Sequence, residues 1–211
     1  ILAQVYNSRR LAEAARRQYD APEKSVLWVG QVFLGLEHLH IQMQTLLRDL
    51  KPANVVLDTL GRAKLTDFGF GRFGAESNGM WTFGCPPGSP GYICPEILNQ
   101  QEYDFKADLY SFGVLVWVLL SGGVSYDPQP RPPWGCRKDA NGREVHDFKA
   151  HLRDWKFLKE CLDDPENHGA LRLGANAKTF VASLTHRRAH SRSDHKGIRQ
   201  TTFMQDLRLP L

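Results

Sequence analysis

Apolar side chains recur at helical spacing in several segments of the chain. Residues 22–40 place valine, phenylalanine or leucine at every third or fourth position, and Asp20 and Pro22 supply the cap and first-turn proline of a helix start. Residues 105–120 form a second such segment, whose second half is apolar on every side, as expected of a helix at the centre of a domain. Helical spacing returns at 148–158.

Between the first two helices the pattern changes to short runs typical of strands. Residues 55–57 and 63–65 are such runs, and Asp58–Gly61 separates them, which predicts two small strands joined by a tight turn. Residues 73–95 form a long loop rich in Gly, Pro and Ser, a length that a compact domain rarely carries without a use for it. The proline-rich stretch 122–145 is predicted to be an irregular insert.

The order of these elements predicts a mainly α domain with a small β element at one edge, an α+β fold. The domain is expected to cover residues 22–205, preceded by a short lead-in helix and linker at 1–21.

The composition is that of an ordinary soluble domain. The chain has 211 residues, of which 42% are hydrophobic and 24% charged, which excludes collagen-like, coiled-coil and disordered classes. Its longest apolar stretch, 112–120, is shorter than the ~20 residues that span a bilayer, and no signal segment opens the chain. We therefore expect a cytoplasmic protein without a membrane partner.

The net charge of +4 is concentrated near the end of the sequence. From Asn176 onward seven Lys and Arg stand against two Asp, and most of them lie in a Ser/His/Arg-rich stretch, 185–200. A nucleic-acid interface would place basic residues along a face with aromatic residues between them. We interpret the stretch as a solvated loop and expect no nucleic-acid partner. The four cysteines show no C-x-x-C spacing and are expected to be free thiols.

The segment with the most chemistry is Leu47–Asn54, followed by Asp67-Phe68-Gly69. Together they offer two carboxylates, an amide and an ammonium group, on either side of a strand pair that can fold them together. Asp and Asn oxygens suit Mg²⁺, a lysine can neutralise a phosphoryl group, and a second carboxylate can orient a hydroxyl. The alternative is a surface turn in which Asp and Asn serve as caps, but the spacing matches the first interpretation throughout.

These residues resemble the catalytic loop and metal-binding motif of eukaryotic protein kinases. The match continues in order: Cys94-Pro95-Glu96 resembles the A-P-E motif, and the segment from Asp108 to Gly113 resembles D-x-W-S-x-G. Arg172-Leu-Gly174 resembles the late R-L-G whose arginine pairs with the A-P-E glutamate, so Arg172 is expected to pair with Glu96. The resemblance covers about 25–175 and implies the large, C-terminal lobe of a kinase.

The resemblance implies a role for each matching residue. Asp49 is the catalytic aspartate that accepts or orients the hydroxyl proton of the substrate, and Lys51 contacts the γ-phosphate. Asn54 and Asp67 are the Mg²⁺ ligands, and Val56 lies under the adenine ring. The implied cofactors are ATP and Mg²⁺, and the implied partner is a protein substrate with Ser or Thr, because tyrosine kinases usually have Ala or Arg near the Lys51 position. Leu47, in place of the usual His, and Phe68 match positions in the hydrophobic spine.

The activation segment resembles that of the cyclic-nucleotide-dependent-like branch. Thr82, in Trp81-Thr-Phe83, matches its activating phosphothreonine, which an upstream kinase would modify and the guanidinium of Arg48 would bind. Ser89 takes the place of the threonine that contacts Asp49 and Lys51.

The small lobe of a kinase has no counterpart in this sequence. Residues 1–17 contain no glycine, hence no G-x-G-x-x-G loop, and no V-A-I-K strand. Two functions therefore stay open: a Ser/Thr kinase of which this chain is a portion, and a non-catalytic kinase-like binding or regulatory module. The isolated chain is expected not to phosphorylate a generic peptide at a useful rate.

Overall fold

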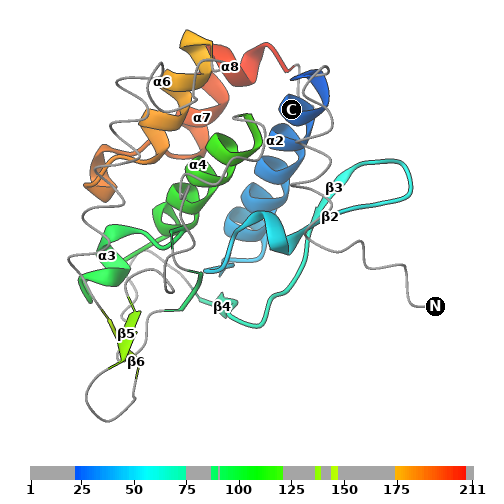
Figure 1. The fold of residues 1–211 in the computed structure, drawn as a ribbon. Helices are drawn as coiled ribbons and strands as arrows, with labels where there is room; N and C mark the ends of the chain where they lie inside the picture. The colour runs from blue at the N-terminus through cyan, green and yellow to red at the C-terminus, as the bar shows by residue number, and fades with distance from the viewer. Residues whose placement is uncertain are drawn as a thin grey trace.

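The structure, a computed structural model, describes residues 22–74, 87–89, 91–120 and 174–207, together with the backbone of 136–138 and 144–146 (Figure 1). The helical elements are α2 (Pro22–Glu37), the π-helical turn η1 (His38–Gln42), the 3₁₀ turns η2 (Pro52–Asn54) and η3 (Ala189–Ser191), α3 (Pro95–Leu98), α4 (Lys106–Leu120), α6 (Ala175–Leu184), α7 (His195–Gln200) and α8 (Thr202–Gln205). The strands are β1 (Thr45–Leu46), β2 (Val55–Leu57), β3 (Ala63–Leu65), β4 (Arg72–Phe73), β5 (Cys136–Lys138) and β6 (Glu144–His146). None of the helices in these ranges combines the length and the apolar character needed to cross a membrane.

Helix α4 is the centre of the fold. Every side chain from Ala107 to Leu119 is buried, which confirms the prediction from its apolar character on all sides. Figure 1 shows α4 between α2 and α6. The ring of Phe112 on α4 contacts both neighbours, since its centroid lies 6.1 Å from that of Phe33 and 6.2 Å from that of Phe180. The mainly α fold with a small β element is confirmed.

The strands form three two-stranded antiparallel sheets, β1–β4, β2–β3 and β5–β6. The predicted pair is β2–β3, with Val55 opposite Leu65 and Leu57 opposite Ala63. The β5–β6 pair corrects the prediction that 122–145 is irregular throughout. The prolines dominated that prediction, although the Asn141-Gly142 dipeptide is a common sequence signal for a hairpin turn.

Helix α2 fixes the β2–β3 hairpin in place. The indole Nε1 of Trp28 donates to the carbonyl of Gly61 at 2.9 Å, and the side-chain oxygen of Gln31 accepts from the amide of Ala63 at 2.7 Å. Gly35 packs closely on Leu65, since an added Cβ would come within 3.0 Å of that side chain. The hairpin therefore has a defined position, and so do the residues at its two ends.

The basic stretch 185–200 is only in part the solvated loop that the charge pattern predicts, although Arg187, Arg188 and Lys196 are exposed. It contains η3 and all of α7, the carboxylate of Asp194 caps α7 by accepting from the amide of Gly197 at 2.7 Å, and Arg192 is only 2% exposed. A cation can be buried where carboxylate and carbonyl oxygens surround it, which residue composition alone does not reveal.

Candidate active site

The loop between β1 and β2 brings the predicted catalytic residues together. The side-chain amide of Asn54 donates to the carbonyl of Asp49 at 2.8 Å and to its Oδ2 at 2.9 Å. The Nζ of Lys51 also donates to Oδ2 of Asp49, at 2.8 Å. Asp49 is 3% exposed, and its Oδ1 is a buried acceptor without a partner among the described residues. One oxygen is thus held by Lys51 and Asn54, and the other has no hydrogen-bond partner in the described part of the chain.

The segment 87–89 reaches this loop through a serine. Lys51 Nζ donates to the hydroxyl of Ser89 at 2.5 Å, which is one of the two contacts expected of this serine. Gly88 has a φ of 110°, and an added Cβ would lie 2.6 Å from the carbonyl oxygen of Arg48. Only glycine fits here, because both the backbone conformation and the contact exclude a side chain.

Asn54 and Asp67 stand at the two ends of the β2–β3 hairpin. The amide of Thr66 donates to the carbonyl of Asn54 at 3.0 Å, which places Asp67 one residue beyond that contact. Asp67 is exposed, with a φ of 60°. Because the side-chain nitrogen of Asn54 donates to Asp49, the side-chain oxygen of Asn54 remains available as a ligand. These hard oxygen donors fit Mg²⁺.

A cation at this site would depend on further oxygen ligands. Within the described ranges no three His, Cys, Asp or Glu side chains form a metal-binding cluster. Mg²⁺ commonly takes one or two protein ligands and completes its shell with phosphate oxygens and water. Val56, predicted to lie under adenine, is partly buried and pairs with Lys64 in the hairpin.

The backbone before Asp49 is fixed by the carboxylate of Asp108. The amide of Leu47 donates to its Oδ2 at 2.7 Å and the amide of Arg48 to its Oδ1 at 2.8 Å. Asp108 and Leu47 are both fully buried. Arg48 has a φ of 64°, an uncommon conformation for a residue with a side chain, and its hydrogen bond to Asp108 stabilises it.

The side chain of Arg48 connects the catalytic loop with neighbouring segments. Its Nε donates to the carbonyl of Phe70 at 2.7 Å and its Nη1 to the hydroxyl of Tyr103 at 3.2 Å. Thr82, its predicted phosphorylated partner, lies outside the described residues.

The two predicted spine residues differ in their packing. Leu47 is fully buried, whereas Phe68 is 51% exposed at the edge of an open cleft of about 510 Å³ between α2 and β3. The prediction that Phe68 packs in the spine is therefore wrong for this structure, because the ring borders the cleft instead of entering the core.

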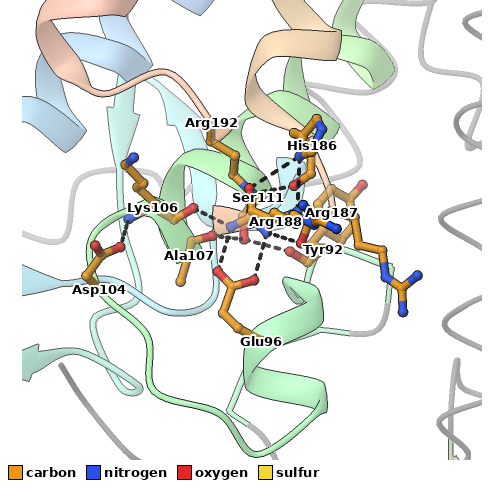
Figure 2. A network of polar contacts seen from close by, with 10 residues as sticks. All are labelled: Tyr92, Glu96, Asp104, Lys106, Ala107, Ser111, His186, Arg187, Arg188 and Arg192. Atoms are coloured by element: carbon orange, nitrogen blue, oxygen red, sulfur yellow. Dashed lines mark hydrogen bonds and ion pairs between the residues drawn. The ribbon is translucent and has the colours of Figure 1, made fainter. Parts of the chain in front are cut away.

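The partner of Glu96 is also corrected. Both of its oxygens accept from Arg192, Oε1 from Nη1 at 2.5 Å and Oε2 from Nη2 at 2.7 Å (Figure 2). Arg192 takes the role that the sequence interpretation gave to Arg172, which lies outside the described residues. The guanidinium additionally donates to the carbonyls of His186 at 2.7 Å and Lys106 at 3.0 Å. It therefore joins α3 to the start of α4 and to the loop before η3.

A buried thiol, that of Cys94, lies beside this pair. Cys94 is 1% exposed, and its burial, together with the charge of Glu96, raises the pKa of its thiol well above the ordinary value. This cysteine is a neutral core residue.

Comparison with known proteins identifies the family. The protein kinase domain family matches residues 1–204. The chain is 30% identical to protein kinase C of Drosophila melanogaster over 204 residues, 80% of this chain and 27% of that protein. It is 39% identical to human cGMP-dependent protein kinase 2 over 111 residues, 53% of this chain and 14% of that protein. It is 30% identical to the serine/threonine-protein kinase Sgk3 of Rattus norvegicus over 171 residues, 76% of this chain and 31% of that protein.

The chain belongs to the protein kinase family. Its relatives include serine/threonine kinases and a cGMP-dependent kinase, in agreement with the branch that the activation segment resembles. The chain spans between about a seventh and a third of the length of these three relatives.

Proposed function

We propose that this chain carries the catalytic loop of a protein serine/threonine kinase, which transfers the γ-phosphate of ATP to a Ser or Thr hydroxyl of a protein substrate. The observation that carries the proposal is the state of Asp49: one carboxylate oxygen is held by Lys51 and Asn54, and the other is buried without a partner in the described part of the chain. A free, fixed acceptor beside an ammonium group is what a substrate hydroxyl needs.

Asp49, Lys51 and Asn54 have different roles in this transfer. Asp49 Oδ1 accepts the hydrogen of the hydroxyl and orients the oxygen for attack. Lys51 places a positive charge beside that carboxylate and can contact a phosphoryl oxygen, because its amine is partly exposed. Asn54 holds the carboxylate with its nitrogen and leaves its oxygen for a cation. When bound, Mg²⁺·ATP supplies the transferable phosphoryl group, and Asn54 and Asp67 would hold its Mg²⁺.

Replacing Asp67 by alanine is expected to weaken Mg²⁺-dependent binding of ATP about tenfold or more, because a charged ligand worth about 1.5–3 kcal/mol is lost. Titration calorimetry with the full chain, with and without Mg²⁺, measures this. Asp58→Ala is the matched control, since the Asp58 carboxylate lies in the turn of the same hairpin and, in the described part of the chain, accepts from Leu60 and Arg62.

Binding of ATP that is equal without Mg²⁺, or unchanged by Asp67→Ala, would contradict the proposed role of this residue. A chain that binds no nucleotide but captures a kinase substrate would support the other function, a non-catalytic module.

We also propose that phosphate on Thr82 orders the activation segment through Arg48. A phosphate adds about −1.5 to −2 charges and acceptor oxygens that a guanidinium binds strongly. Phosphorylation is expected to protect residues 73–95 from proteolysis in the parent chain and not in Arg48→Ala. Mass spectrometry of limited digests compares the parent chain and Arg48→Ala, each with and without phosphate on Thr82. Equal cleavage in all four samples would refute the switch.

A further inference from the structure

A continuous series of hydrogen bonds leads from α7 to the backbone before Asp49. The Nε2 of His195 lies 2.8 Å from Nδ1 of His40, and Nε2 of His40 lies 2.9 Å from Oδ2 of Asp108. Asp108 in turn accepts from the amides of Leu47 and Arg48. Helix α7 is thus connected with the catalytic loop through two buried side chains, those of His40 and Asp108.

The acceptor at one end determines where the hydrogens lie. Asp108 receives two backbone N–H groups, so its carboxylate acts as an acceptor and His40 must carry a hydrogen on Nε2. In neutral His40 the other nitrogen, Nδ1, is then an acceptor. His195 must therefore donate from its Nε2 for the contact to be a hydrogen bond.

The packing encloses His40 completely, whereas His195 is partly exposed. His40 is fully buried and stacks on Phe105 with 4.7 Å between ring centroids. The ring of His195 meets that of His40 edge-on at 5.0 Å and lies 6.4 Å from Phe33. If His195 lost its donor, Nδ1 of His40 would be a buried acceptor without a hydrogen bond.

Burial keeps the ring of His195 in the neutral form, against the effect of the neighbouring carboxylates. Burial, the largest effect, lowers the pKa of His195 to about 4, against the opposing effects of Glu37, Asp194 and Asp104. Glu37, on α2, is itself paired with Arg199 of α7 at 2.5 Å. At neutral pH the ring therefore carries one hydrogen, and the geometry directs it to His40.

We propose that His195 is a positioning residue for the catalytic loop: its Nε2–H fixes His40 in the tautomer that holds Asp108 against the two amides before Asp49. The catalytic role of this loop rests on the proposed function, whereas the positioning of its backbone by His195 does not. The contribution of His195 is a specific N–H donor, and a substituent that packs equally well cannot replace it.

Two variants separate the donor from the packing. His195→Gln keeps an amide nitrogen near the place of Nε2 but loses the ring, and His195→Phe keeps a ring but loses the donor. In the full chain, hydrogen exchange at the amides of Leu47 and Arg48 is expected to stay within about twofold of the parent in His195→Gln and to become about tenfold faster in His195→Phe. Lys196→Gln, at an exposed neighbouring position, controls for changes in α7 and should leave the exchange unaltered.

The ¹⁵N resonances of the His40 ring give a second, independent measurement in the parent chain. They are expected to show a hydrogen on Nε2 and an unprotonated Nδ1, and the reverse tautomer would overturn the inference even if a variant fails to fold. Exchange that is as slow in His195→Phe as in the parent, or as fast in His195→Gln as in His195→Phe, would also overturn it. None of these measurements uses a nucleotide, so they remain valid if ATP binding fails, and failed ATP binding alone contradicts only the proposed function.

Discussion

Replacing Arg192 by alanine is expected to lower the free energy of unfolding by about 3–5 kcal/mol, because the carboxylate of Glu96 would remain buried without its partner. The two side chains are 2% and 6% exposed and are joined by two hydrogen bonds, so water cannot substitute for the lost guanidinium without opening the fold. The carbonyls of His186 and Lys106 would lose a donor as well. Urea denaturation followed by circular dichroism measures the change.

Two comparisons test whether the pair itself is responsible. Arg188→Ala removes an exposed arginine from the same loop and should change stability by no more than about 0.5 kcal/mol. The double variant Glu96→Ala/Arg192→Ala should lose clearly less than the sum of the two single variants, since the second substitution removes the unpaired charge. Additive losses, or an Arg192→Ala chain as stable as the parent, would show that the two residues are not coupled.

Replacing Asp108 by asparagine is expected to cost about 2–5 kcal/mol of unfolding free energy, although the two side chains have the same shape. Three N–H groups, from Leu47, Arg48 and His40, point at its two oxygens. An amide offers one oxygen and places an NH₂ group against a donor, so at least two buried polar groups lose their partners at about 1–3 kcal/mol each. Denaturation in urea measures the loss.

Asp58→Asn is the matched control for Asp108. Asp58 also accepts from two backbone amides, those of Leu60 and Arg62, and from the Arg62 side chain at 2.7 Å, but it lies in the exposed turn of the β2–β3 hairpin. Water can satisfy the groups that this substitution releases, so its effect on stability should be small. Similar losses in the two variants would mean that burial of Asp108 is not the source of its contribution.

The features that could be predicted from the sequence are local ones. The periodicity of 22–40 and the apolar character of 105–120 depend on residues within one element, and helices α2 and α4 follow them closely. The contacts among Asp49, Lys51 and Asn54 could also be foreseen, because the three residues lie within six positions of one another and the loop has little freedom to separate them.

The features that could not be predicted join distant parts of the chain. Glu96 and Arg192 are 96 residues apart, and a sequence with arginines at both 172 and 192 does not reveal which of them the fold brings to the carboxylate. His195 is similar, since nothing in its neighbourhood indicates a partner 155 residues away. The interpretation of 185–200 as a solvated loop assigned Arg192 and His195 to solvent, whereas burial of a polar side chain depends on what the tertiary fold places opposite it.

Two adjacent residues of the activation segment, Gly88 and Ser89, determine two different properties of its approach to the catalytic loop. The absence of a side chain at 88 sets how near the two backbones come, and the hydroxyl at 89 sets what Lys51 binds once they are near. Substitutions at 89 can therefore alter the chemistry offered to Lys51 while the spacing stays the same. Substitutions at 88 alter the spacing and move the hydroxyl at 89 away from Lys51. The two positions therefore face different constraints although they share one peptide bond.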